Sequence, residues 1–145
     1  MQVHQILKSK GTDGVYTVTP GTTVSEAARI LTEKRIGTVV VSEDGEIALG
    51  ILSERDIVRE LASKGAACLD ASVDTYMTSD PFTCAREDSA DGILTRMTEG
   101  RFRHMPVVED GKMVGLVTLG DVVKARLTEL AAEKDALEGM ISNPW

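Results

Sequence analysis

The 145-residue sequence is built from two similar halves. The segments TTVSEAARIL (22–31) and EDSADGILTRM (87–97) align with an offset of 66 residues. In both, apolar residues recur at i, i+3, i+4 and i+7, the spacing of an amphipathic helix with one buried face. A repeat of this kind indicates that the chain folds as two similar units. The apolar positions are Val24, Ala27, Ala28 and Leu31 in the first copy, and Ala90, Ile93, Leu94 and Met97 in the second.

Both helices carry a start signal. In the first, Thr23 stands three residues before Glu26, which predicts a capping box in which the two side chains satisfy each other's backbone amides. In the second, Asp88 or Ser89 is the candidate N-cap.

Short apolar strands surround each helix. An Asp-Gly pair, Asp44-Gly45 or Asp110-Gly111, separates the last two strands of each copy and predicts a tight hairpin. A short helical turn opens each copy, because Val3-x-x-Ile6-Leu7 resembles Val73-x-x-Tyr76-Met77. One copy alone would leave a sheet face uncovered, so we expect the two to pack sheet against sheet. The expected strands are Tyr16–Val18, Thr38–Val41 and 47–52, and then Phe82–Cys84, Met105–Val108 and 113–117.

The division of the chain follows from the repeat. We expect a first repeat at 1–66, a linker at 67–72, a second repeat at 73–127 and a C-terminal helix extension at 128–145, with the repeats forming one module. The stretch SKGAACLDAS (63–72) is small and polar enough for a surface connector.

Each half ends in the same element, GILSERDIVR (50–59) and GLVTLGDVVK (115–124). Two interpretations are open. Ser53 with Asp56, and Thr118 with Asp121, could be helix caps, since a hydroxyl and a carboxylate three residues apart approximate a capping box. They could also form a polyol and phosphate site, because Asp is shorter than the usual Glu and freer to point outward, next to the free amides of a helix start.

Composition excludes several functions. The formal charge is −7 and the sequence contains no basic stripe, so we expect no nucleic-acid partner. No apolar run is long enough to span a bilayer, and the N-terminus lacks a signal-peptide segment, so we expect no membrane association and a cytoplasmic protein. Cys68 and Cys84 lack CxxC spacing and are expected to be buried thiols. With only His4 and His104, and no nucleophile or phosphate-loop motif, we expect no enzyme and no metal site.

The last helix is expected to run from Leu119 until Asn143-Pro144 stops it. It carries a narrow apolar stripe that could pack back on the core or pair with another subunit, and we favour the second because the repeats already supply a core. The stripe is Leu127, Leu130, Leu137 and Ile141.

The two Gly-x-x-Ser/Thr-x-x-Asp elements, with RFRHMPVVEDGKMVG before the second, resemble a pair of CBS domains, the family named after cystathionine β-synthase. The resemblance covers about Val3 to Leu127 and is closest to small stand-alone bacterial proteins of this family. It implies an α/β (α+β) fold with tandem β-α-β-β-α repeats, in which two small sheets pack around a pseudo-two-fold axis, plus a C-terminal helix. It also implies a homodimer, which in this family is commonly a flat disc formed through the helices.

The resemblance further implies a regulatory module that binds AMP, ADP, ATP or possibly NAD(H) between the repeats, or S-adenosylmethionine in some relatives, with no catalytic cofactor and an unknown effector protein as partner. Arg55 in the first motif has Gly120 as its counterpart, so the two sites would be unequal. The alternative is a ligand-free scaffold, in which the aspartates serve only as caps and Met105 and Ile36 fill the cleft. The implied ribose and phosphate contacts are Ser53, Arg55, Asp56, Arg103, His104, Thr118, Gly120 and Asp121, and the implied base-lining residues are Thr17, Val18, Thr19, Ile36, Gly37, Thr38, Thr83, Met105 and Pro106.

Overall fold

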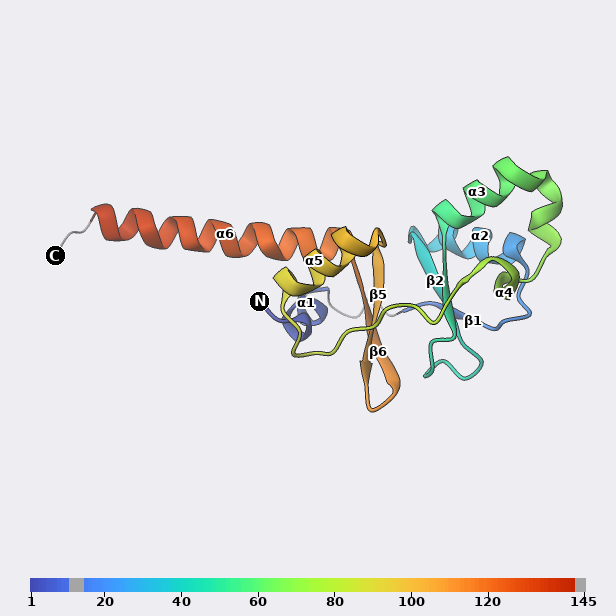
Figure 1. Cartoon of the computed structure of the whole chain (residues 1–145), viewed down its shortest axis with the longest axis horizontal. Coiled ribbons are helices and arrows are strands. Elements are labelled where there is room, and N and C mark those ends of the chain that lie inside the picture. The colour runs from blue at the N-terminus through green and yellow to red at the C-terminus, as the bar shows by residue number, and fades with distance from the viewer. Residues whose placement is uncertain (11–14, 143–145) are drawn as a thin grey trace.

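The computed structural model describes residues 1–10 and 15–142. Figure 1 shows two small sheets in the middle of the molecule, with helices outside each sheet and a long C-terminal helix extending away. The elements in the first half are α1 (Val3–Ser9), β1 (Thr17–Val18), α2 (Val24–Lys34), β2 (Thr38–Val41), β3 (Gly50–Ser53) and α3 (Glu54–Lys64). A 3-10 helix, η1 (Gly65–Asp70), leads to α4 (Val73–Tyr76), β4 (Thr78–Ser79), α5 (Ala90–Gly100), β5 (His104–Glu109), β6 (Lys112–Thr118) and α6 (Leu119–Ser142).

The two sheets differ in size. The first has the order β1-β2-β3-β4, with β1 parallel to β2 and the other neighbours antiparallel. The second is the antiparallel pair β5-β6. The expected strand at Phe82–Cys84 is wrong, because it is reduced to one parallel bridge between Cys84 and Val107. Two small sheets between helices, followed by a C-terminal helix, confirm the predicted fold class.

The opening helices are exchanged between the repeats. Val3 and Ile6 of α1 are buried in the hydrophobic cluster of the second repeat, whereas Val73 of α4 is buried in the cluster of the first. Equivalent backbone hydrogen bonds hold both, from Val3 N to Asp88 O at 2.9 Å and from Val73 N to Thr22 O at 2.8 Å. The repeats therefore interlock, because the helix that opens each copy in the sequence packs in the core of the other copy.

Two glycines make room for the exchanged segments. A Cβ at Gly50 would lie 2.8 Å from the backbone oxygen of Thr78 and 2.4 Å from Sδ of Met77. A Cβ at Gly115 would lie 2.7 Å from Cδ2 of Leu7. The first glycine of each repeated element thus has a packing role, since each final strand accepts a segment that leads in from the other repeat.

Of the two expected hairpins, one is confirmed. Asp110 and Gly111 have φ values of 52° and 78° between paired Glu109 and Lys112, as a tight turn with two left-handed residues requires. In the first repeat Val41 pairs with Gly50, so residues 42–49 form a longer loop. There the Asp44 carboxylate accepts hydrogen bonds from the backbone amides of residues 46 and 47, and the return strand begins at Gly50 instead of residue 47.

The caps are partly as expected. Thr23 accepts a hydrogen bond from the amide of Glu26 at 3.1 Å, but the Glu26 carboxylate pairs with Arg29, so the predicted capping box is only half formed. Ser89, not Asp88, caps α5 through the amide of Gly92 at 3.0 Å.

The connector is more ordered than expected. Residues 63–72 contain the end of α3 and the 3-10 helix η1. Cys68 in η1 is only 1% exposed, so this segment contributes a buried side chain and is not a pure surface connector. Both cysteines are free and buried, as predicted.

Helix α6 has a packed first part and an exposed remainder. Val122 and Ala125 are buried in the cluster of the second repeat. The predicted stripe is exposed, which makes packing back on the core wrong. The predicted stop at Asn143-Pro144 lies outside the described residues.

Candidate functional site

Both Ser/Thr-x-x-Asp elements are complete capping boxes. At the start of α3, Ser53 Oγ accepts from the amide of Asp56 at 3.2 Å, and Asp56 Oδ2 accepts from the amide of Ser53 at 2.9 Å. At the start of α6, Thr118 and Asp121 make the same two bonds at 3.2 and 2.9 Å. The expectation that aspartate would point away from the cap is therefore wrong in both copies.

The cap uses only part of each carboxylate. The second oxygen of Asp56, Oδ1, accepts from Nη2 of Arg59 at 3.0 Å. In Asp121 the capping oxygen Oδ2 also accepts from Nζ of Lys10 at 2.8 Å, and no described residue donates to its Oδ1. A capping aspartate can accept further hydrogen bonds, so capping and ligand binding are compatible here.

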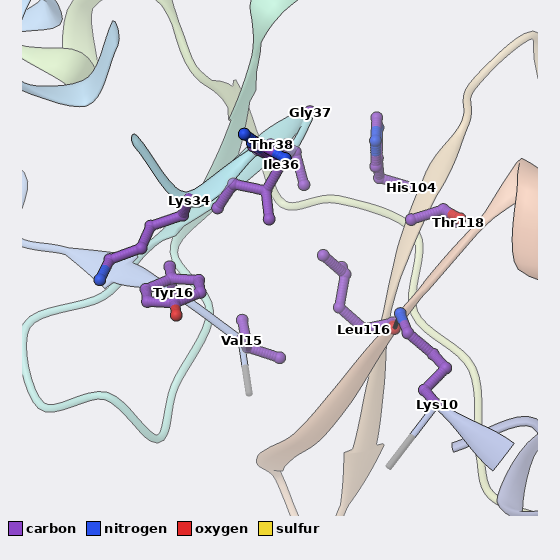
Figure 2. Close-up of a pocket in the computed structure, with 11 residues that line it drawn as sticks. Lys10, Val15, Tyr16, Lys34, Ile36, Gly37, Thr38, His104, Leu116 and Thr118 are labelled. Atoms are coloured by element: carbon purple, nitrogen blue, oxygen red, sulfur yellow. Dashed lines mark hydrogen bonds between the residues drawn. The ribbon is translucent and has the colours of Figure 1, made fainter. Parts of the chain in front are cut away.

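Two pockets lie between the repeats, one beside each motif. The Thr118 pocket, of about 450 Å³, is lined by His104, Leu116 and Thr118 of the second sheet and by Lys10, which follows α1. Val15, Tyr16 and residues 34–38 line its other side (Figure 2). The Ser53 pocket, of about 380 Å³, is lined by Ile51, Ser53, Arg55, Asp56, Arg59 and Thr78, and by residues 101–104 of the second repeat. Both volumes fall within the roughly 300–1,000 Å³ of small-molecule sites.

Each pocket is lined by residues from both repeats. Residues 35–38 and 101–104 follow α2 and α5, and both turns begin with an arginine in the left-handed region, Arg35 with φ 54° and Arg101 with φ 56°. The Ser53 motif faces the turn of the second repeat, and the Thr118 motif faces the turn of the first. Each turn also adjoins the motif of its own repeat, because the amide of Glu54 donates to Gly37 O at 2.9 Å and the amide of Leu119 donates to Arg103 O at 2.8 Å.

The pockets are basic although the chain carries a formal charge of −7. Four arginines line the Ser53 pocket, with Asp56 the one carboxylate among its described lining residues. Lys10, Lys34 and Arg35 line the Thr118 pocket. A clustered set of guanidinium and ammonium groups favours an anionic ligand. The arginines are Arg55, Arg59, Arg101 and Arg103.

His104 lies where the pockets meet. It lines both, and also a third pocket of about 220 Å³ that contains Ser53 and Thr118. Burial lowers the pKa of His104, and the Arg103 charge lowers it further, against the opposing effect of Asp56. His104 therefore favours the neutral imidazole, which can accept a hydrogen bond as well as donate one.

The lowered pKa of His104 predicts a pH-dependent stability. Below the ordinary pKa of 6.5 the unfolded chain binds a proton at this residue more readily than the folded chain. The stability that comes from neutral His104 is thus fully present above pH 6.5 and is lost as the pH falls through the lowered pKa. In urea unfolding over this range, His104→Gln is expected to show a shallower fall in the free energy of unfolding than the wild type. Equal slopes would contradict this, and His4→Gln, at an exposed position, is the control.

The predicted site residues separate into three groups. Ser53, Arg55, Asp56, Arg103, His104, Thr118, Gly120, Ile36, Gly37 and Thr38 line the three pockets between the repeats. Asp121 adjoins them through its ion pair with Lys10. Val18, Met105 and Pro106 are buried, while Thr17, Thr19 and Thr83 are exposed, and none of these six lines a described pocket, so any contact they make with a base remains a prediction.

Several lining residues were missed from the sequence. They include Lys10, Tyr16, Lys34, Arg35, Arg59, Arg101 and Phe102. One signal was present, because Tyr16 and Phe82 are aromatic residues at the repeat offset of 66. Tyr16 lines the Thr118 pocket, with Nζ of Lys34 5.5 Å from its ring centroid, whereas Phe82 stacks at 4.9 Å on Phe102 of the Ser53 pocket.

The described part of the chain gives little support for a metal site or for a nucleophilic Cys84. Residues 1–10 and 15–142 contain no group of three or more His, Cys, Asp or Glu that could hold a metal ion. Burial raises the pKa of Cys84 to about 12, so its thiol is a poor nucleophile. None of the described helices has the length and apolarity to cross a membrane.

Comparison with known proteins agrees with this architecture. A family model of the CBS domain matches residues 7–63 and 73–128. A CBS-domain protein of Agrobacterium tumefaciens is 45% identical, with a TM-score of 0.81 over 87% of this chain and 99% of that one. A CBS-domain protein of Pyrobaculum aerophilum, solved in complex with AMP, is 26% identical, with a TM-score of 0.77 over 91% and 99% of the two chains. A mitochondrial CBS-domain protein of Arabidopsis thaliana is 33% identical over 99% of this chain and 73% of its own length.

Two interlocked repeats with basic pockets between them, together with the CBS-domain match and the AMP complex of a relative, support a ligand-binding regulatory module. The chain belongs to the CBS-domain family and contains a pair of CBS repeats, which confirms the resemblance seen in the sequence. CBS pairs are in general regulatory and not catalytic.

Proposed function

We propose that this protein is a sensor that binds an adenosine-containing ligand, AMP, ADP, ATP or NAD(H), between its two CBS repeats. One observation carries the proposal: each Ser/Thr-x-x-Asp motif faces a basic turn from the other repeat across a pocket large enough for a nucleotide. The AMP complex of the Pyrobaculum relative supports the same ligand class.

The proposed binding mode follows from the donors and acceptors present. The carboxylates of Asp56 and Asp121 accept the ribose hydroxyls while they continue to cap their helices. The phosphate is held by pocket arginines and by the amides at the starts of α3 and α6, where the helix dipole favours an anion. Tyr16 and Phe102 offer aromatic faces for the base.

The two sites should differ in phosphate preference. The Ser53 pocket has four arginines, whereas in the Thr118 pocket Lys10 already binds Asp121 and the carbonyl oxygen of Leu116, at 2.8 and 2.9 Å. A ribose on Asp121 has to share or displace this ammonium group. We therefore expect ligands with more phosphates to favour the Ser53 pocket.

The regulatory output follows from the shared pockets. A ligand that contacts both repeats stabilises one relative arrangement of them, and a ligand can shift such an equilibrium only by its difference in affinity for the two states. We propose that an effector protein responds to this arrangement, in an energy-sensing role in the cytoplasm. A homodimer is part of the proposal.

The scaffold alternative has one observation in its favour, because both aspartates are caps. Its second expectation is not met. Met105 is 0% exposed in the core of the second repeat and does not fill the cleft, and Ile36 lines a pocket of about 450 Å³ without closing it. The sensor interpretation is therefore the better supported of the two.

A comparison of AMP with adenosine tests the proposal. If the basic side chains bind phosphate, AMP should bind more tightly than adenosine in isothermal titration, by about 10- to 100-fold for one charge-assisted contact. Arg103→Gln should reduce that difference. The matched control is Arg86→Gln, which removes a surface arginine paired with Glu109 and lining none of the described pockets. Equal affinity for AMP and adenosine, or an equal effect of both variants, would contradict phosphate recognition here.

A further inference from the structure

Two aromatic residues, Tyr16 and Phe82, stand at equivalent positions of the repeat but have different partners. In the first repeat, Nζ of Lys34 lies 5.5 Å from the centroid of the Tyr16 ring (Figure 2). In the second repeat, the Phe82 ring stacks on the ring of Phe102, with the centroids 4.9 Å apart and the two planes 16° from parallel. A cation therefore accompanies the aromatic residue of the first repeat, whereas a second aromatic ring accompanies that of the second repeat.

The last residue of the preceding helix differs in the same way between the repeats. Helix α2 ends with Lys34, and α5 ends with Gly100 at the equivalent position. A Cβ at Gly100 would lie 2.7 Å from Cδ1 of Phe102 and still closer to Cε1, so any side chain here would collide with the ring as it stands. The first repeat has Ile36 where the second has Phe102. The stacked ring is thus possible only because the second repeat combines this phenylalanine with a glycine.

The Phe102 ring is held by several contacts. Phe82 stacks on it, the end of α5 lies against its edge at Gly100, and the hydrophobic cluster of the second repeat packs against it. The same ring lines the Ser53 pocket, whereas Phe82 and Gly100 line a neighbouring surface pocket of about 310 Å³ that also contains Phe102. Phe102 is therefore an aromatic wall of the Ser53 pocket, and residues outside that pocket set its orientation.

We propose that Phe82 and Gly100 are positioning residues that orient Phe102 as a stacking surface for the base of the ligand in the Ser53 pocket. This inference rests on the proposed function and deepens it, because it assigns base recognition at one site to two residues that do not line that site. A base stacked on an aromatic side chain gains about 5- to 150-fold in affinity. A ring that is already held in place avoids the entropy cost of being ordered on binding.

The Thr118 pocket offers the base a different surface. Tyr16 lines that pocket directly, Ile36 takes the place of the Phe102 ring, and Lys34 belongs to the same lining. Phe82 and Gly100 contribute nothing to the lining of this pocket. Their substitution should therefore change base recognition in the Ser53 pocket and leave the Thr118 pocket as it is.

The affinities for AMP and for ribose 5-phosphate, which lacks the base, measure the contribution of the base. Isothermal titration uses AMP as the ligand and ribose 5-phosphate as a competitor, in an Asp121→Ala background that leaves the Ser53 pocket as the intact site. Phe82→Leu should lower the affinity for AMP by about 2- to 10-fold, the value of an aromatic pair, and leave that for ribose 5-phosphate unchanged. Phe82→Tyr, which keeps the stacked ring, should retain the full affinity for AMP.

A second variant and a matched control complete the test. Gly100→Ala should lower the affinity for AMP in the same selective way, and alanine is the better helix former, so this variant is expected to fold even if Phe82→Leu does not. Tyr16→Leu removes the equivalent ring of the first repeat and should leave the AMP affinity of the Ser53 pocket unchanged.

The two ligands distinguish the possible failures. If Phe82→Leu and Gly100→Ala bind AMP as tightly as the parent protein, or lose affinity for both ligands equally, the positioning role is wrong while the proposed function stands. If the parent protein binds ribose 5-phosphate as tightly as AMP, the base is not recognised and the inference is overturned. If it binds neither ligand, the proposed function fails, and this inference fails with it.

Discussion

Asp56→Ala and Asp121→Ala are each expected to weaken adenosine-nucleotide binding by about 10- to 150-fold at the affected pocket. The loss corresponds to about 1.5–3 kcal/mol for a hydrogen bond between a carboxylate and a ribose hydroxyl. Because both aspartates also close a capping box, the free energy of unfolding should fall as well, by about 0.5–2 kcal/mol. Titration calorimetry and urea unfolding measure the two effects separately.

The matched control for these variants is Thr23→Ala. Thr23 caps α2 through the amide of Glu26 and lines none of the described pockets. It should lose stability as the aspartate variants do, while nucleotide affinity stays at the wild-type value. If the aspartate variants lose stability and keep their affinity, the motifs are caps alone.

Gly50→Ala is expected to lower the free energy of unfolding by about 1–3 kcal/mol, the usual cost of overpacking. The added Cβ would lie 2.8 Å from the backbone oxygen of Thr78, which cannot rotate away as a side chain can. The pairing of Gly50 with Ser79 would have to shift, and with it the contact of α4 with the first repeat. Urea unfolding gives the size of the effect.

Alanine substitutions at two further glycines give reference values for this loss of stability. Gly115→Ala should cost less, because the clash at 2.7 Å is with the end of the flexible Leu7 side chain. Gly21→Ala should be near neutral or slightly stabilising, since nothing lies within 4 Å of its added Cβ. Equal stability of all three variants would mean that the exchanged segments do not pack as the structure describes.

Much of the fold could be predicted from local sequence patterns. The apolar spacing of α2 and α5 and the Asp110-Gly111 turn depend on neighbouring residues, which a sequence displays directly. The exchange of α1 and α4 could not be predicted, because repeat alignment shows which segments are alike and not which segments touch. The loop at 42–49 was misjudged because the Asp44 side chain binds its own following amides, which opens the turn.

The two motifs of the site could be predicted from the sequence, but the two pockets beside them could not. The Ser/Thr-x-x-Asp spacing identified Ser53 and Thr118 correctly as strand-to-helix junctions. The arginines that surround Ser53 come from residues 55–59 and 101–103, so no basic cluster is visible along the sequence. Lys10 reaches Asp121 across 111 positions, a contact that only the exchanged packing of α1 makes possible.

The most direct measurement is isothermal titration of purified, nucleotide-stripped protein with AMP, ADP, ATP, NAD and NADH, repeated with Asp56→Ala and Asp121→Ala. We expect saturable micromolar binding of at least one of these ligands, and weaker binding by at least one variant. If none of the ligands binds the wild type, the protein is not an adenosine-nucleotide sensor, and its Ser53 and Thr118 motifs serve as helix caps in an interaction scaffold.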